Sequence, residues 1–191
     1  MLDTIRRCYA AKIREYFIFL GLSPQATFRC RYAAFCFRAI SMANTFYQLR
    51  AHLVFSTQGR RQFITETIAP RLHAYLGGAL RDEGVAPLCV GGYLDHVHLL
   101  IGFKPVHRLS DLVRTVKTNS SKWLNEQNAS LHRFAWQRGY SIFSVSHSQV
   151  GVVRAYVANQ VEHHARLTFE DELRLLLKRH GIEFDEEYLL D

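Results

Sequence analysis

Two apolar runs with a very short connection place the tightest limit on how this chain can fold. Leu88–Tyr93 and His96–Phe103 are both rich in β-forming residues, and only Leu94-Asp95 lies between them. Strands joined by so short a segment pair in an antiparallel manner, because a parallel pair needs a long crossover. The sequence therefore predicts an antiparallel pair of strands in the middle of the chain.

Segments with helical and extended periodicity alternate on both sides of this pair. The order of the predicted elements is β-α-β-β-α-β-α-α, which indicates an α+β fold with a ferredoxin-like (RRM-like) split βαβ antiparallel sheet and appended C-terminal helices. That scaffold hosts many functions, so architecture alone does not select one. Besides the central pair, the predicted elements are a strand at Phe46–Ser56, a helix at Thr65–Glu83 stopped by Gly84, a helix at Asp111–Gln127 capped by Ser110, an extended segment at Phe134–Ser146, a helix at Ser148–Arg166 and a helix from Thr168 to Arg179 opened by a capping-box variant.

The first 41 residues differ in character from the rest. They hold three of the four cysteines and none of the ten histidines, and a helix is predicted at Thr4–Leu20. A clear strand pattern begins just after Met42. We therefore interpret residues 1–41 as an N-terminal extension, a candidate for translated upstream sequence outside the native protein, and residues 42–191 as one domain.

Charge and composition narrow the function classes. Residues 42–169 hold fourteen Lys and Arg against seven Asp and Glu, which suits a polyanionic partner such as nucleic acid. No apolar run approaches the ~20 residues that span a bilayer, so no membrane association is expected. The cysteines form neither a disulfide framework nor a CxxC zinc motif, and a reducing, cytoplasmic setting is the simplest interpretation. No Walker-type glycine loop is present, so no nucleotide cofactor is expected.

Two histidines lie two residues apart in the strand that begins at His96. His96 and His98 share one face of that strand, ~7 Å apart along the backbone, so their rings can converge on one metal ion. A pair of hydrogen-bonded strand histidines without a metal is an equally good interpretation of this pattern alone.

A tyrosine and a glutamine lie four residues apart in the predicted third helix. Tyr156 and Gln160 are therefore neighbours on one helix face, although in isolation a core tyrosine beside a surface glutamine is the better interpretation of this spacing. With the histidine pair, they suggest metal-assisted attack by a tyrosine on a phosphate. Two histidines and a glutamine give three neutral ligands and leave positions open for phosphate oxygens, and imidazoles alone favour zinc or copper.

The arrangement resembles the single-tyrosine HUH transposases of small bacterial insertion sequences, the IS200-like family, from Met42 to Leu190. The motifs that carry the resemblance are Ala51–Thr57, Asp95-His96-Val97-His98, Lys117-x-x-Ser120-Ser121-Lys122-Trp123, Phe134-x-Trp136-Gln137-x-Gly139-Tyr140, Ser144-x-Ser146 and Tyr156-x-x-x-Gln160 followed by Glu162-His163-His164. The extra N-terminal segment is the one departure from the family pattern.

This resemblance implies a DNA transposase with a defined site. His96, His98 and Gln160 would bind Mg²⁺ or Mn²⁺, and Tyr156 would be the nucleophile. The family cleaves single-stranded DNA near hairpins at the ends of mobile elements, through a 5′-phosphotyrosine intermediate, and a free 3′-hydroxyl later rejoins the strands. Members usually act as homodimers, some with the tyrosine helix serving the metal site of the partner, whereas relatives of another branch can be monomeric. No nucleotide cofactor is implied.

Five further side chains are candidates for DNA contacts. Arg114, Lys117 and Lys122 could hold phosphates, and Trp136 and Tyr140 could stack on bases, although a solvated helix face and core aromatics are equally good interpretations. His52 and His107 are taken as structural.

Two rival functions remain, besides a related protein of the same chemistry that processes plasmid or viral origins. One is a non-catalytic nucleic-acid-binding module, since RNA-binding domains share the fold. The other is a nuclease that uses the histidine pair and a water nucleophile. That nuclease would need a carboxylate near the metal, and strand alternation directs Asp95 away from His96.

Overall fold

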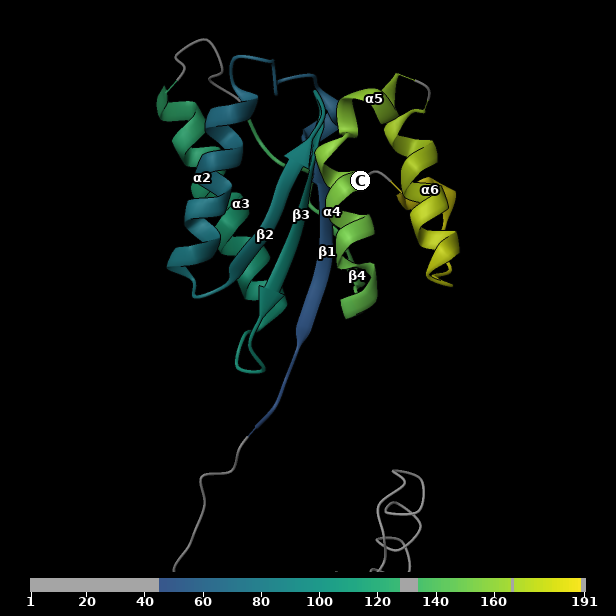
Figure 1. The fold of residues 1–191 in the computed structure, drawn as a ribbon. Helices are drawn as coiled ribbons and strands as arrows, with labels where there is room; N and C mark the ends of the chain where they lie inside the picture. Colours follow the sequence, from purple (N-terminus) through teal and green to yellow (C-terminus); the bar gives the residue numbers. More distant parts are fainter. Residues whose placement is uncertain (1–44, 128–133, 166, 190–191) are drawn as a thin grey trace, which may run out of the picture. The chain divides into compact units, whose positions relative to one another are not determined.

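The computed structural model describes residues 45–127, 134–165 and 167–189 (Figure 1). The chain divides into two units, residues 1–45 and 46–191, and the fold below is that of the second. The helix predicted at Thr4–Leu20 and the boundary expected at Met42 lie outside the described residues.

A four-stranded antiparallel sheet forms the centre of the domain. Its strands are β1 (Leu49–Ser56), β2 (Ala86–Gly92), β3 (His96–Phe103) and β4 (Ser141–Ser144), in the spatial order β2-β3-β1-β4. The predicted antiparallel pairing of β2 with β3 is confirmed, and so is the α+β fold with a split βαβ sheet.

Of the extended segment predicted at residues 134–146, only β4 joins the sheet. β4 pairs with β1, whereas Trp136 makes an isolated bridge to Thr57.

Two long helices, α2 (Ala69–Asp82) and α3 (Leu109–Gln127), pack side by side on one side of the sheet (Figure 1). α2 begins later than predicted, with Pro70 in its first turn, where the missing N–H of proline costs no hydrogen bond. α3 begins at Leu109, so Ser110 lies inside the helix rather than capping it. The N–H of Leu112 already donates to the carbonyl of Arg108 there.

Strand alternation divides the sheet between a core face and a polar face. The face toward α2 and α3 carries buried apolar side chains from both central strands, namely Ala51, Leu53, Phe55, Val97, Leu99 and Ile101. The residues between them point the opposite way, and the register pairs Val54 with His98 and Ser56 with His96. The histidine pair therefore lies on the face away from the main core.

The C-terminal helices lie on the side of the sheet that carries the histidines. They are α4 (Val150–Ala158), α5 (Gln160–His164) and α6 (Phe169–Arg179), preceded by the 3₁₀ turn His147–Gln149. The single helix predicted at residues 148–166 is thus broken at Asn159, where φ is −102° and ψ is 27°. The expected valine stripe is incomplete, because only Val157 is buried and Val161 is 67% exposed.

The last helix starts as predicted. The Thr168 hydroxyl accepts a hydrogen bond from the N–H of Asp171, which is the expected cap. The apolar side of α6 packs on Val54 and Phe143 and forms a second, smaller core with Phe169, Leu173, Leu176 and Leu177.

Gly91 allows α4 to approach the sheet closely. A β-carbon at this position of β2 would overlap the backbone carbonyl oxygen of Val157 in α4. Only glycine accommodates such a contact between a strand and a helix backbone. The residue next to Tyr156 is therefore held directly against the strand that pairs with β3.

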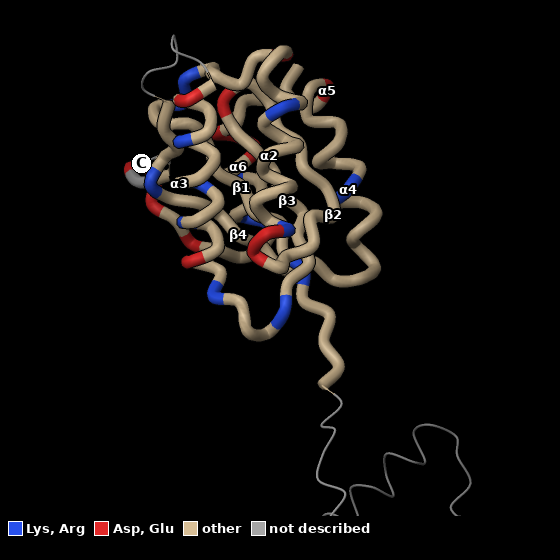
Figure 2. The backbone as a smooth tube through the Cα atoms, turned by 90° about the vertical axis from the view of Figure 1, so that its left-hand side faces the viewer, with Lys and Arg blue, Asp and Glu red and all other residues tan. Residues whose placement is uncertain are grey.

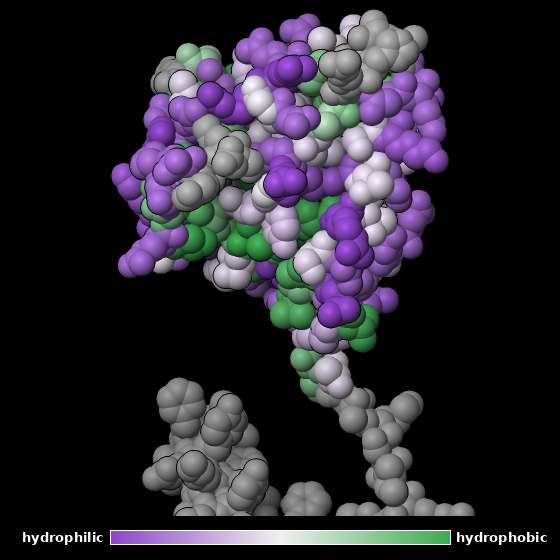
Figure 3. All heavy atoms as spheres, turned by 180° about the vertical axis from the view of Figure 1, so that it is seen from behind, coloured by the Kyte–Doolittle hydropathy of each residue, from purple (hydrophilic) through white to green (hydrophobic). Residues whose placement is uncertain are grey.

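Among the described residues, no helix is long and apolar enough to cross a membrane. From the side opposite to that of Figure 1, most visible side chains are hydrophilic, with hydrophobic ones gathered in a band below the middle of the view (Figure 3).

Candidate metal and nucleophile site

The two strand histidines are fully buried, and each is oriented by a polar neighbour. Nδ1 of His96 lies 2.7 Å from Oδ1 of Asp95, and Nδ1 of His98 lies 2.8 Å from Nε2 of His52. Both contacts engage the Nδ1 atoms and leave the Nε2 atoms directed toward the C-terminal helices. Partners of this kind fix the ring orientation of metal-binding histidines.

Two expectations change with this observation. Asp95 precedes the first residue of β3, so strand alternation does not govern its side chain, and its carboxylate reaches His96. His52, taken as structural from the sequence, lies on β1 and contacts a ring of the histidine pair. Both residues act on the site through the histidines.

Glu172 of α6 brings a carboxylate to the same place. It is only 1% exposed. Its Oε2 lies 3.0 Å from Nε2 of His164 and 3.7 Å from Nε2 of His96, and its Oε1 lies 3.5 Å from Nε2 of His98. A carboxylate thus lies among three imidazole rings that come from β3 and α5.

Tyr156 and Gln160 complete the group. The Tyr156 hydroxyl donates a hydrogen bond to Oε1 of Glu172, and the Gln160 amide donates to the same oxygen over 3.2 Å. The amide oxygen of Gln160 lies 3.3 Å from Nε2 of His96. The ring centroids of Tyr156 and His98 are 5.8 Å apart. The structure therefore brings together all four residues expected to act in one site.

Burial and Glu172 set the protonation of the site. Burial lowers the pKa of His98 to about 4. Burial and then the charge of Glu172 raise the pKa of Tyr156 well above its ordinary value. Burial alone would raise the pKa of Glu172, but hydrogen bonds from His164 and Tyr156, together with the neighbouring His98 ring, hold it far below its usual range. The site thus holds a neutral His98, an uncharged phenol and an ionised carboxylate near neutral pH.

The same groups fit a divalent cation. One ligand atom from each of His96, His98, His164 and Glu172 lies within 4.8 Å of the others. Among the described residues, Nε2 of His98 is buried without a hydrogen-bond partner. A buried imidazole nitrogen of this kind is suited to coordinate a metal. Nitrogen and oxygen donors together are compatible with several divalent ions, so the donor set does not identify the metal.

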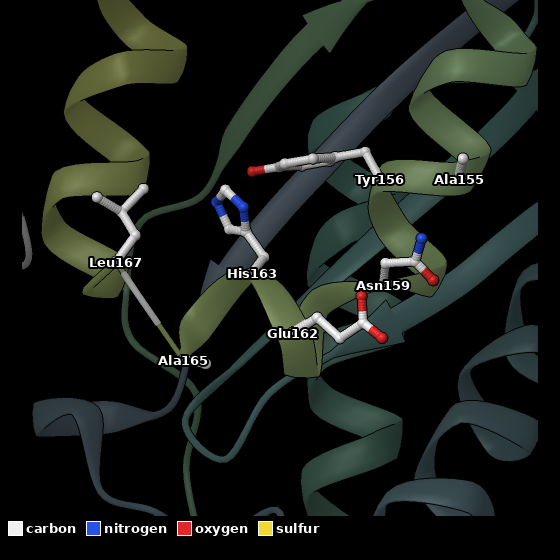
Figure 4. A pocket seen from close by; sticks show the side chains of 7 residues that line it. All are labelled: Ala155, Tyr156, Asn159, Glu162, His163, Ala165 and Leu167. Carbon is white, nitrogen blue, oxygen red and sulfur yellow. The ribbon is translucent and has the colours of Figure 1, made fainter.

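Two pockets meet at the tyrosine. A pocket of about 820 Å³ is lined by the end of α4, by α5 and by Leu167. In Figure 4, the Tyr156 side chain and the His163 ring point toward one another at this pocket. A second pocket of about 430 Å³ lies between β4, α4 and α6, and its walls include Tyr156 and Arg179. Tyr156 therefore borders open space on two sides.

The structure divides the five candidate DNA contacts. Trp136 is 8% exposed, packs edge-on against Phe55 and donates its indole N–H to Ser120. The ammonium of Lys117 donates to the carbonyls of residues 137, 138 and 139. Trp136 is thus buried, and Lys117 is half-buried with its ammonium bound to three backbone carbonyls. Their DNA contacts stay predictions.

The other three candidates lie at the surface. Arg114 pairs with Asp111 at 3.0 Å, Lys122 lies 3.9 Å from Glu126, and Tyr140 is 38% exposed. Along α2 and α3, basic and acidic positions are interspersed rather than gathered in one stripe (Figure 2). Their DNA contacts stay predictions.

Sequence reasoning missed Glu172, although a signal for it exists. Glu172 interrupts the apolar side of α6, between Phe169 and Leu173. A charged residue in the apolar stripe of an amphipathic helix indicates a buried partner. Its partners are far away in the sequence, so the sequence does not identify them.

Comparison with known proteins supports the same family over most of the domain. Residues 45–160 match the family described as "Transposase IS200 like". The ISDra2 transposase TnpA of Deinococcus radiodurans is 25% identical over 119 residues, covering 60% of this chain and 85% of that protein. The transposase for insertion sequence element IS200 of Salmonella typhimurium is 27% identical over 127 residues, covering 64% of this chain and 83% of that protein.

A solved structure agrees with these relatives. The crystal structure of a putative transposase from Deinococcus radiodurans R1 aligns with a TM-score of 0.53 and 25% identity, over 63% of this chain and 96% of that one. The family match covers more than half of the chain and includes both strand histidines, Tyr156 and Gln160. The chain belongs to the IS200-like transposase family, whose members are enzymes of DNA transposition.

Proposed function

We propose that this chain cleaves and rejoins single-stranded DNA by metal-assisted transesterification, with Tyr156 as the nucleophile. Its substrate would be single-stranded DNA with hairpins at the ends of a mobile element. The cation, Mg²⁺ or Mn²⁺, would be held by His96, His98 and Gln160. The convergence of two strand histidines with the phenol and the amide of one helical segment carries this proposal.

The arrangement of side chains suits attack on a phosphate. The cation would polarise a phosphate oxygen and stabilise the negative charge that develops during attack. The hydrogen bond to Glu172 fixes the direction of the Tyr156 hydroxyl, so that the other side of its oxygen can meet phosphorus. Bond formation between this oxygen and phosphorus would break the bond to the 3′-oxygen. The products would be a 5′-phosphotyrosine link and a free 3′-hydroxyl.

The two pockets beside Tyr156 offer space for the strand. A single strand lying across Tyr156 would place nucleotides in the 820 Å³ pocket on one side and the 430 Å³ pocket on the other. The guanidinium of Arg179 in the second pocket is exposed and suits a phosphate contact. The sequence did not single out this residue.

The decisive experiment looks for the covalent intermediate. The purified chain is incubated with Mn²⁺ and a hairpin-bearing single-stranded oligonucleotide labelled on the 3′ side of the cleavage point, and then run on a denaturing gel. A labelled protein band is expected for the wild type and for a variant of an exposed tyrosine outside the site, Tyr47→Phe, and it should be absent for Tyr156→Phe. A labelled band that persists in Tyr156→Phe would exclude this nucleophile.

One observation favours a second candidate, a metal-dependent nuclease that uses water. That function requires a carboxylate beside the metal, and Glu172 supplies one that sequence reasoning did not find. The same gel separates the two functions. A nuclease would cut the oligonucleotide equally well with Tyr156→Phe and without any protein–DNA adduct, whereas a transposase would show neither product with that variant.

A further inference from the structure

We propose that α6 completes the metal site: Glu172 binds the divalent cation through its carboxylate together with His96 and His98, and thereby selects Mg²⁺ or Mn²⁺ over zinc. The inference rests on the proposed function only in taking a divalent cation as the cofactor. It assigns a role to a helix that lies beyond the residues matched by the family, which end at residue 160.

The distances between donor atoms suit one shared cation. Two ligands bound at ~2.1 Å from one ion lie ~3.0 Å apart when they are at right angles and ~4.2 Å apart when they are opposite. Oε1 of Glu172 lies 3.5 Å from Nε2 of His98, and Oε2 lies 3.7 Å from Nε2 of His96. Both separations fall inside this range, although both exceed an ordinary hydrogen bond.

The buried negative charge of Glu172 also supports a cation at this site. A buried carboxylate is costly unless a positive charge or hydrogen bonds compensate it. Within the described part of the chain, no lysine or arginine forms an ion pair with Glu172, and its ionic partners are histidines alone. Hydrogen bonds from Tyr156, Gln160 and His164 compensate part of this negative charge. A divalent cation between Glu172 and the strand histidines would supply the positive charge that no lysine or arginine provides in this part of the chain.

The chemistry of the donors makes Glu172 the residue that selects the metal. His96, His98 and Gln160 are neutral ligands, and imidazole-rich sites favour zinc or copper. A carboxylate oxygen is the donor that magnesium and manganese prefer. Adding Glu172 therefore gives the site an anionic oxygen ligand and moves its preference toward these harder ions.

The position of Glu172 also links the metal to the docking of α6. The helix packs on the sheet through the small core with Val54 and Phe143, and Glu172 projects from the same side of the helix. A bond from Glu172 to a cation held by β3 would add a second anchor. Metal binding should then protect the backbone of α6 as well as that of β3.

The test compares two metals and uses no DNA. Calorimetric titrations of the full chain with Mn²⁺ and with Zn²⁺ are run on the wild type, Glu172→Gln and Glu183→Gln. The second variant removes the same charge from an exposed position just after α6. Glu172→Gln should weaken Mn²⁺ binding by about 10–100-fold and Zn²⁺ binding by clearly less, whereas Glu183→Gln should bind both metals as the wild type does.

A second measurement needs only the wild type, so it does not depend on the folding of a variant. Hydrogen exchange of the peptide that contains α6 should slow when Mn²⁺ is added. Unchanged Mn²⁺ affinity in Glu172→Gln, an equal loss for both metals, or Mn²⁺ protection of β3 without α6 would each overturn the inference. The metal titrations and the hydrogen exchange contain no oligonucleotide. A failure to form the phosphotyrosine adduct in the gel experiment would therefore refute the proposed function without changing what they show about Glu172.

Discussion

His98 and His52 form a buried pair of imidazoles whose protonation the fold resists. Burial lowers the pKa of His98 to about 4, and burial together with His98 lowers that of His52 to about 3. Both rings are therefore neutral at physiological pH. Neutral imidazole is the form that binds a metal, so the site needs little deprotonation before it can be loaded.

These lowered pKa values predict acid sensitivity. Between pH 6.5, the ordinary value for histidine, and about pH 4, the unfolded chain binds protons at His52 and His98 but the folded chain does not. The pair therefore contributes stability above pH 6.5 that is lost as the pH falls toward 4. His52→Gln, which keeps a polar group near His98, should show a smaller loss across this range. Urea unfolding at several pH values measures the free energy of unfolding of both proteins. If this free energy fell equally steeply with falling pH in the wild type and in His52→Gln, the prediction would be contradicted.

At the scale of residues, the sequence predicted the parts that depend on short spacing. The shared face of His96 and His98 follows from strand alternation, and the proximity of Tyr156 and Gln160 follows from a separation of four residues. Glu172 could not be placed in this way, because its partners come from different elements. The sequence left Trp136 open between a base contact and a core position for a related reason, since its burial depends on how α3 meets the sheet.

At the scale of elements, the approach of α4 to the sheet depends on Gly91. Gly91→Ala would force β2 and α4 apart at Val157 and displace Tyr156 from Glu172. We expect a loss of at least about 2 kcal/mol in stability, as for other overpacked contacts, and a severe drop in adduct yield.

A glycine in α4 itself provides the matched control. A β-carbon at Gly151 would meet no atom within 4 Å. Gly151→Ala should raise stability by about 0.5–1 kcal/mol, the usual gain in a helix interior, with normal adduct yield. Thermal unfolding and the adduct gel measure both variants, and a wild-type adduct yield from Gly91→Ala would show that the close approach does not position the tyrosine.

The order and type of these elements followed well from periodicity, whereas only some of their ends did. β3 spans the residues expected, and α6 begins at the expected threonine cap. The sequence does not signal the break at Asn159, because neither glycine nor proline stands at the junction of α4 and α5. Helix ends depend on hydrogen bonds made by neighbouring segments, which a local pattern does not contain.

At the scale of the whole molecule, one chain contains every part of its own site. α4 packs on β2 and β3 of the same chain, so Tyr156 faces its own histidines. The homodimer expected for the family stays a prediction, and it would not require exchange of this helix.

This arrangement predicts a failure of complementation. Tyr156→Phe and His96→Ala chains, each inactive alone, should form no DNA adduct when mixed, because neither site regains its missing part. Wild-type chains mixed with either variant serve as the control and should give adduct in proportion to their share. Adduct from the mixed variants would mean that the tyrosine serves the histidines of a partner chain.

Delivery of Glu172 by α6 has a consequence for the timing of synthesis. The strand histidines emerge from the ribosome well before Tyr156, and Glu172 emerges after both. A growing chain can therefore build its sheet while still unable to assemble a complete reaction centre. Until α6 is free to dock, the growing chain would lack the carboxylate of this site.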